Sequence, residues 1–341
     1  MKKDICVLRI MATLAVVFMH SCNSMTANAE LFSVSGRQYV FFACCTTAMM
    51  WAVPAFYMIT GELLLSSNKE YSFGYMLSHN VRRMFLALLL FGVPFSLMEF
   101  VAENNKLDIK YVYQAFLSIV NGQSWDHLWY LYSIIGIYLV IPIFKRALER
   151  FDKKEIISLI VLLYVFDILM PYLDLLIGTT IYFKIPIVGY ALLYVLLGYF
   201  ISKYEIARYI KREVLLITII ALTIILILLC IICKDSFLKY VGYDSPITVV
   251  HSALLFILSK QISTSKLSKD SIIWKIDRLC FGVYLIHPFF INLIYKVVHI
   301  YPAKSNFYYF TIFMFWMVFA GASFATSFIL NKIRIISKYV L

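Results

Sequence analysis

Residues 214–233 read VLLITIIALTIILILLCIIC, a stretch dominated by Ile and Leu that contains no charged residue. An apolar run of about 20 residues is long enough for a helix to cross the hydrocarbon core of a bilayer. Similar runs recur along the whole chain, without the alternating pattern of transmembrane barrel strands. The sequence therefore predicts an all-α, polytopic integral membrane protein.

The composition of the 341 residues supports this fold class. Hydrophobic residues make up 62% of the chain and charged residues 15%, against about 45–50% and about 25% in soluble proteins. A soluble globule of this size could not cover so much apolar surface, and a disordered chain would be poor in such residues. Both of these classes are excluded.

Ten apolar windows predict about ten transmembrane helices. The fifth and eighth are short for a hydrocarbon core about 30 Å thick, so we expect them to be tilted, extended or partly buried in the bundle. The predicted spans are Ile5–Cys22, Tyr39–Leu65, Met84–Val101, Leu128–Phe144, Ile156–Met170, Ile185–Ile201, Val214–Cys233, Ile247–Ser259, Leu279–Val297 and Phe307–Leu330.

The positive charges indicate the orientation of these spans. With the N-terminus in the cytoplasm, 22 of the 31 Lys and Arg residues fall in inner segments and 8 in outer ones. Inner loops of membrane proteins are rich in Lys and Arg, so this pattern predicts that both termini are cytoplasmic. It also explains the net charge of +12 better than a nucleic-acid partner, which we do not expect. The loops are short, which predicts one transmembrane domain over residues 1–341 and no separate soluble domain.

Cys230 and Cys233 have the CxxC spacing of some metal and redox sites. They lie in the apolar stretch quoted above, where a thiolate pair would have no polar support, so we interpret them as packing residues. The P-loop, GxGxxG, GxSxG and HExxH motifs do not occur. We expect no bound metal and no permanently bound cofactor.

Two ionisable residues interrupt the first apolar span. Arg9 and His20 are eleven residues apart, which places them on nearly the same helix face, about 16 Å apart along the axis. Such residues are costly inside a membrane and often mark a functional site. His20 is a candidate general base. The alternative is a structural histidine bonded to a neighbouring helix, with Arg9 reaching the inner surface.

Three further charged residues lie near the predicted inner surface. Glu62 follows Gly61 at the end of the second span, and a structural ion pair with Arg9, Arg82 or Arg83 explains it at least as well as catalysis. Arg82 and Arg83 begin the third span. They suit a phosphate clamp for an anionic donor, but they are also typical of a positive-inside loop.

The outer side carries aromatic and histidine residues. His127, Trp129 and Tyr130 open the fourth span, where an aromatic belt and a sugar-stacking platform are both possible. His287 lies near the middle of the ninth span, and Pro288 frees a backbone carbonyl beside it. We expect His287 to face the bundle interior or a water-filled cavity.

Five motifs, taken in order, resemble the membrane acyltransferase-3 family over essentially the whole chain. Each motif is weak alone, but the five together are fairly specific. They are Arg9–His20, Val53–Gly61, His127–Leu131 with Tyr138–Pro142 beyond it, Leu196–Tyr199 and Tyr284–Pro288.

The resemblance implies an O-acyltransferase of the bacterial plasma membrane. Its donor would be cytoplasmic acetyl-CoA or another acyl-CoA, and its acceptor a hydroxyl group of a surface or lipid-linked glycan. Arg9 and His20 would form the catalytic core. One departure concerns the third span, where many members carry an R-x-x-R pattern. This chain has adjacent Arg82 and Arg83, with Phe85 and Leu86 where the second arginine would stand.

The remaining candidates divide between the two substrates. Arg82, Arg83 and Glu62 are candidates for donor binding, and His127, Trp129, Tyr130, Tyr284 and His287 for an acceptor pocket. The alternative is a transporter or flippase for a lipid-linked sugar, which would consume no acyl-CoA. Nothing in the pattern indicates an oligomeric state.

Overall fold

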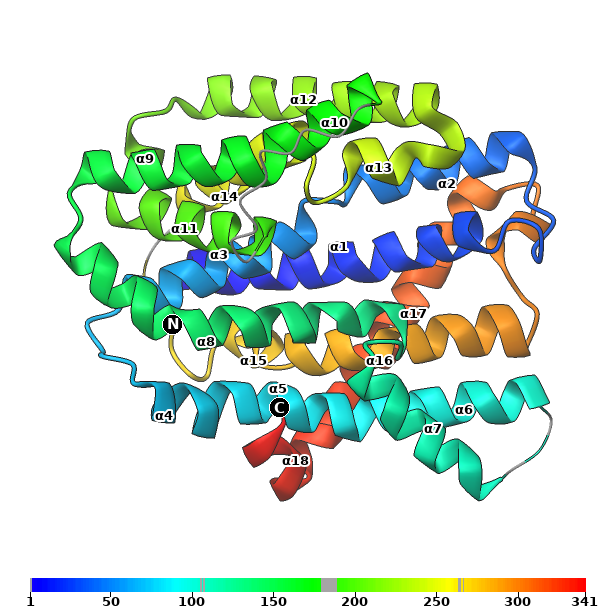
Figure 1. Ribbon diagram of the computed structural model, residues 1–341. Coiled ribbons are helices and arrows are strands. Elements are labelled where there is room, and N and C mark those ends of the chain that lie inside the picture. The colour runs from blue at the N-terminus through cyan, green and yellow to red at the C-terminus, as the bar shows by residue number, and fades with distance from the viewer. Residues whose placement is uncertain (1, 105, 107, 179–188, 263–264, 266) are drawn as a thin grey trace.

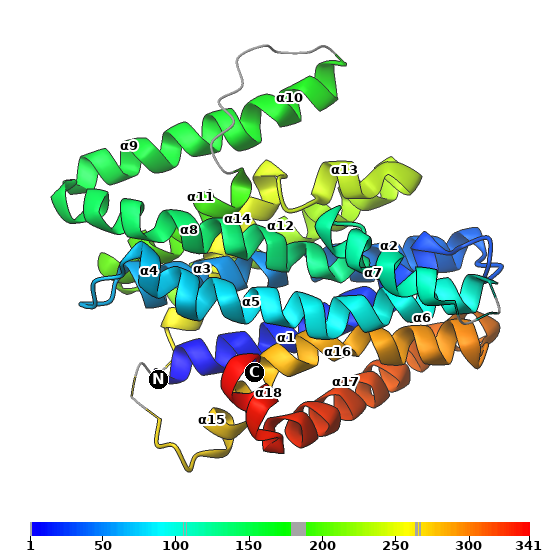
Figure 2. The same cartoon turned by 60° about the horizontal axis from the view of Figure 1, so that its bottom comes forward.

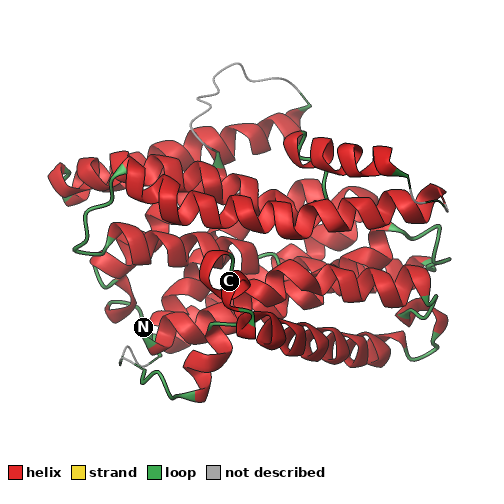
Figure 3. Cartoon of the chain, turned by 90° about the horizontal axis from the view of Figure 1, so that it is seen from below, coloured by secondary structure: helices red, strands yellow, loops and turns green. Residues whose placement is uncertain are grey.

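The computed structural model is built from helices packed side by side, and no strand occurs in the part of the chain that it describes (Figures 1 and 3). The all-helical fold class is therefore confirmed. The structure describes residues 2–104, 106, 108–178, 189–262, 265 and 267–341. Lys184 and Lys266, which contribute to the predicted charge pattern, lie outside these residues.

Eight helical units among the described residues are long and apolar enough to cross a membrane. The chain is thus a multi-pass membrane protein. The units are Lys3–Ala27 (α1); Gly36–Leu65 (α2 Gly36–Ala48, α3 Ala52–Leu65); Phe73–Ala102 (α4 Phe73–Met76, η1 Leu77–Val81, α5 Arg82–Ala87, η2 Leu88–Gly92, α6 Val93–Asn104); Asp126–Arg150 (η3 Asp126–Leu128, α8 Trp129–Arg150); Lys153–Ile177 (α9 Lys153–Leu163, η4 Tyr164–Leu169, α10 Met170–Ile177); Arg212–Cys233 (α12); Cys280–Lys304 (α16 Cys280–Asn292, η7 Leu293–Val297, η8 Pro302–Lys304); and Tyr308–Lys332 (α17).

The other two predicted spans fall on shorter helices. The predicted span Ile185–Ile201 corresponds to α11 (Tyr190–Lys203), and its residues 185–188 lie outside the described residues. The eighth span corresponds to α14 (Pro246–Lys260) and is short, as predicted. The other short helices are α7 (Ile109–Val120), η5 (Ile206–Arg208), η6 (Lys234–Ser236), α13 (Phe237–Val241), α15 (Ile272–Asp277) and α18 (Arg334–Tyr339).

The predicted end of the fifth span at Met170 is wrong. Pro171 lies in the first turn of α10, directly after the π-helical segment η4, so the helical path continues through it. Proline is tolerated in a first helical turn because its missing N–H would be unpaired there anyway. The path ends at Gly178, which has a left-handed conformation with φ +71°.

Helix α1 lies at the centre of the bundle (Figure 2). It packs against α2, α3, α14, α15, α16 and α17, and it is the most buried of the eight candidate spans. Helices α9, α10 and α12 are far less buried, as expected for elements that face lipid. The helix that carries Arg9 and His20 is therefore enclosed by other helices.

The second predicted span is interrupted between Ala48 and Ala52, just before a proline. Helix α2 ends at Ala48 and α3 begins at Ala52, so Pro54 lies in the first turn of α3. There its missing N–H costs no helical hydrogen bond. The break gives α3 a direction of its own, and α3 packs closely against α11.

Helices α3 and α11 approach each other through one glycine on each side. A Cβ atom added to Gly61 would lie 1.8 Å from the carbonyl oxygen of Val195, and one added to Gly198 would lie 2.1 Å from that of Met58. Small residues allow this close approach of membrane helices. Gly61 and Gly198 are therefore the residues that allow this close helix contact.

We expect Gly198→Ala to lower the free energy of unfolding by about 1–3 kcal/mol, because the added methyl group forces two backbones apart. Thermal denaturation of the purified protein in detergent measures the change. The matched control is Gly321→Ala in α17, where an added Cβ atom meets no other atom within 4 Å. Equal melting temperatures for the two variants would contradict the account of this contact.

Candidate active site

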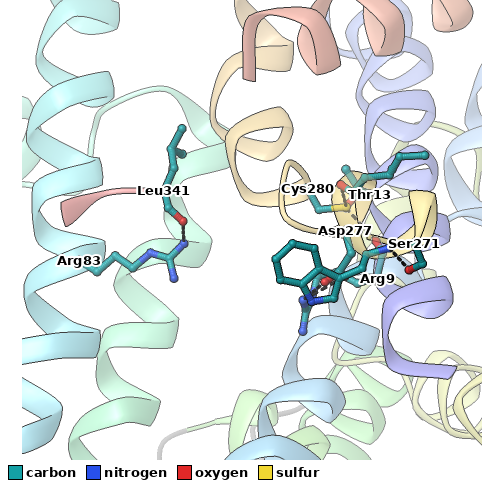
Figure 4. A network of polar contacts seen from close by, with 9 residues as sticks. Arg9, Thr13, Arg83, Ser271, Asp277, Cys280 and Leu341 are labelled. Atoms are coloured by element: carbon teal, nitrogen blue, oxygen red, sulfur yellow. Dashed lines mark hydrogen bonds and ion pairs between the residues drawn. The ribbon is translucent and has the colours of Figure 1, made fainter. Parts of the chain in front are cut away.

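The guanidinium group of Arg9 forms an ion pair with Asp277, the last residue of α15 (Figure 4). Arg9 Nη1 lies 3.0 Å from both carboxylate oxygens. The Asp277 side chain is 1% exposed and that of Arg9 is 22% exposed. Burial raises the pKa of the Asp277 carboxyl group, and the charge of Arg9 opposes this rise. Asp277 therefore holds the guanidinium in one place.

A cavity of about 460 Å³ opens beside this ion pair, and we call it the arginine cavity. Its charged lining comes from α1, α5 and the region of α15. Aromatic side chains from α8 and α16 form much of the rest. The charged residues are Arg9, Arg83, Asp277 and Arg278, and the aromatic residues are Phe56, Tyr130, Tyr138, Phe281 and Tyr284.

Arg83 and its neighbour Arg82 point to different surroundings. Arg83 donates hydrogen bonds from Nε to the carbonyl oxygen of Val340, at 2.7 Å, and from Nη2 to that of Leu341 (Figure 4). Arg82 is exposed and lies over the ring of Tyr339, 5.5 Å from its centroid. Only Arg83 of the two is in the lining of the arginine cavity. Because neighbouring residues on a helix point about 100° apart, the pair does not form a two-arginine clamp.

Glu62 belongs to a different group of charges. It forms ion pairs with Lys260 and, at 3.3 Å, with Lys2, while Lys260 also binds Asp4 at 2.7 Å. The predicted pairing of Glu62 with Arg9, Arg82 or Arg83 is therefore wrong. Lys260, at the end of α14, reaches both carboxylates, a contact that no local sequence pattern indicates.

A second cavity, of about 320 Å³, lies on the other side of the bundle core, and we call it the polar cavity. His20 and His127 both line it. Most of its remaining lining consists of amide, hydroxyl and charged side chains. These are Asn23, Ser24, Asn28, Glu99, Gln123, Ser124, Asp126, Asn292 and Lys296.

Three histidines from separate elements meet in the core, and we call His20, His127 and His287 the histidine cluster. The ring centroids of His20 and His287 are 5.2 Å apart, and those of His127 and His287 are 5.6 Å apart. His127 and His287 are buried. Within the described ranges, no group of three His, Cys, Asp or Glu side chains is arranged to hold a metal ion.

Tyr284 connects the two cavities. Its ring lines the arginine cavity, and its hydroxyl group donates a hydrogen bond to the carbonyl oxygen of His127, which lines the polar cavity. The ring of His127 is 5.7 Å from that of Tyr284. A residue that lines the arginine cavity is thus in direct contact with one that lines the polar cavity.

The two aromatic residues after His127 have different positions. Tyr130 lines the arginine cavity, 5.6 Å from the ring of Tyr284, and is absent from the described lining of the polar cavity. Trp129 packs against Tyr243, with 5.6 Å between ring centroids, and is absent from the described linings of both cavities. The structure therefore places Trp129 with the packing residues.

Asp277 is the site residue that the sequence analysis missed. It directly precedes Arg278 and lies two residues before the predicted ninth span. An acidic side chain so close to the membrane interior needs a positive partner. That partner, Arg9, lies 268 residues away in the chain, and one sequence does not reveal such a pairing.

A protein-family model for an acyltransferase domain, Acyl_transf_3, matches residues 3–332. The chain belongs to this acyltransferase family, as the five motifs predict, and its general function is acyl transfer. No curated protein and no solved structure matches the chain significantly.

We expect Asp277→Asn to lower the free energy of unfolding by about 3 kcal/mol. This is the lower end of the range for breaking a buried ion pair, because Arg9 keeps some contact with water. Thermal denaturation in detergent measures the loss. The control is Glu205→Gln, since the Arg208–Glu205 pair is largely exposed and its loss should change stability by less than about 0.5 kcal/mol. A similar small effect at Asp277 would show that this ion pair does not hold Arg9.

Proposed function

We propose that this transmembrane domain, residues 1–341, moves an acetyl group from cytoplasmic acetyl-CoA to a hydroxyl group of a surface or lipid-linked glycan in the bacterial plasma membrane. One observation carries the proposal. Two cavities of different chemistry, one lined by arginines and one by amides and hydroxyls, lie on either side of the contact between Tyr284, which lines the first, and His127, which lines the second together with His20. Such an arrangement suits two substrates that react at one buried point.

The arginine cavity suits the acyl donor. Coenzyme A carries phosphate groups, and guanidinium groups match phosphate geometry. The cavity volume of about 460 Å³ is in the range of small-molecule sites. Arg9 is fixed by Asp277, while Arg83 is held by carbonyl oxygens of Val340 and Leu341. A phosphate group that binds Arg83 there must share or replace these two contacts.

The polar cavity suits the acceptor. A sugar presents many hydroxyl groups, each of which needs a hydrogen-bond partner when it leaves water. Asn23, Ser24 and Gln123 offer such partners in the lining. Trp125 also lines the cavity, where its ring stacks on Phe95 at a centroid distance of 4.3 Å and offers an apolar wall.

His20 is the proposed general base. The acceptor hydroxyl oxygen forms a bond to the thioester carbonyl carbon while His20 takes its proton, and the carbon–sulfur bond then breaks. His20 returns the proton to the departing CoA thiolate, so atoms and charges balance. Arg9, in the arginine cavity, is proposed to stabilise negative charge on the donor. Tyr284 and Tyr130 shape the path between the donor and the histidine cluster.

The family match favours acyl transfer over the alternative of sugar transport. The contact between Tyr284 and His127 lies between the two cavities. A transported sugar would have to pass this point, whereas an acyl group only has to reach it.

We expect His20→Ala to slow transfer by about 10²–10⁴-fold, the usual contribution of a general base. The assay follows the radiolabelled acetyl group from acetyl-CoA to glycans in membrane vesicles of the producing cell. The control is His79→Ala, since His79 is exposed and stacks on Tyr75 outside both cavities. Undiminished transfer by His20→Ala would remove His20 from the mechanism.

A further inference from the structure

His287 is followed by a proline, and this pair of residues alters the hydrogen bonds of α16. Pro288 has no N–H group, so the carbonyl oxygen of Tyr284, four residues earlier, loses its usual helical donor. Nδ1 of His287 lies 2.8 Å from this oxygen and 3.1 Å from that of Val283. The histidine ring thus replaces the donor that the proline removes.

These contacts determine which ring nitrogen of His287 carries the proton. Both partners of Nδ1 are backbone carbonyl oxygens, which only accept hydrogen bonds, so Nδ1 must donate. In the neutral ring, Nε2 then carries a lone pair. The His287 side chain is fully buried, and its Nε2 atom has no hydrogen-bond partner among the residues that the structure describes. A buried acceptor of this kind is costly unless a donor reaches it.

His127 is fixed in a similar way. Its Nε2 atom lies 3.3 Å from the carbonyl oxygen of Leu285 and therefore donates, which leaves Nδ1 as the acceptor. Of these two fixed rings, His287 is the one whose acceptor nitrogen is buried without a partner among the described residues. His20 is the third ring, and its centroid is 5.2 Å from that of His287. A centroid separation of 5.2 Å leaves room for the His20 ring to turn and bring one of its nitrogens within hydrogen-bond reach of His287 Nε2, while the His287 ring stays in place.

We propose that His287 is a positioning residue whose Nε2 accepts a hydrogen bond from one ring N–H of His20. The other nitrogen of His20 is then unprotonated and available to a hydroxyl group in the polar cavity. This inference rests on the proposed function, in which His20 is the general base. When His20 takes the proton of the glycan hydroxyl group, the N–H that it already carries still points at His287 Nε2. This hydrogen bond stabilises the positively charged His20 ring. His287 keeps its own Nδ1 proton throughout.

The Tyr284–Pro288 motif therefore has a chemical role. Pro288 leaves the carbonyl group of Tyr284 without a helical donor, and His287 donates to that carbonyl instead. This hydrogen bond fixes the tautomer of the His287 ring. A third group that orients the base in this way is a general feature of enzymes that use histidine. In this chain the orienting group is a neutral imidazole rather than a carboxylate.

Two substitutions separate positioning from packing. In His287→Asn the side-chain amide reaches the place of Nδ1 and can still donate to Tyr284, but no acceptor remains at the place of Nε2. In His287→Gln an amide oxygen reaches the place of Nε2 and can accept from His20. We expect His287→Asn to lower kcat for labelled acetyl transfer by about 10–100-fold with KM for acetyl-CoA unchanged. We expect His287→Gln to retain at least about a tenth of kcat.

The comparison is made with vesicles that hold equal amounts of each variant, after both elute as single peaks in detergent. Equal losses in the two variants, or full activity of His287→Asn, would overturn the positioning role while wild-type transfer continues. If the wild-type protein itself transfers no label from acetyl-CoA, the proposed function fails, and the role of His287 fails with it.

A second measurement does not depend on turnover. Nitrogen-15 NMR of the intact protein, labelled at histidine, reports which ring nitrogen is protonated. We expect His287 to be neutral with its proton on Nδ1, and its Nε2 signal to shift in His20→Ala because a donor is lost. A proton on Nε2, or an Nε2 signal that is unaffected by His20→Ala, would contradict the inference.

Discussion

A charged side chain inside an apolar bundle must meet a partner, and the ion pair of Arg9 with Asp277 is the contact on which the candidate site depends. It joins α1, the central helix, to the segment just before α16. The same constraint explains Lys260, which binds Asp4 and Glu62. It also explains the buried Lys145, which donates to the carbonyl oxygens of Leu65, the last residue of α3, and of Ser67 just beyond it. Each buried charge thus ties one helix to another.

The ion pair also gives the two halves of the site their different chemistry. Because α1 and α16 are held together beside it, the arginine cavity forms on one side and the histidines of the same two helices meet further along. His20 and His287 lie on these helices, and His127 joins them through the bond from Tyr284. The guanidinium groups of Arg9 and Arg83 therefore lie at the arginine cavity, and the three imidazole rings lie further along the bundle. This separation suits a reaction between an anionic donor and a neutral hydroxyl group.

Sequence patterns predicted the fold class and family, because apolar runs and short motifs are local features. They also singled out Arg9, His20 and His287, because each is an ionisable residue inside an apolar span. They failed where a partner lies far away in the chain, as for Asp277 with Arg9 and Lys260 with Glu62. Arg82 and Arg83 look equivalent in sequence, but helix geometry separates them, and only Arg83 lines the cavity. One sequence also does not reveal which face of α8 turns towards the arginine cavity, where Tyr130 lies.

We propose that the acyl-CoA donor occupies the arginine cavity and that its acyl group reaches the histidine cluster from there. A cryo-electron microscopy structure with a non-hydrolysable analogue of acetyl-CoA tests it most directly. We predict that the phosphates lie against Arg9 or Arg83, and that the acyl carbon points past Tyr284 towards His20. Addition of a sugar hydroxyl from the polar cavity would then complete a reacting pair about 3–3.5 Å apart. An analogue bound in the polar cavity, or with its acyl group directed away from the histidines, would contradict the account.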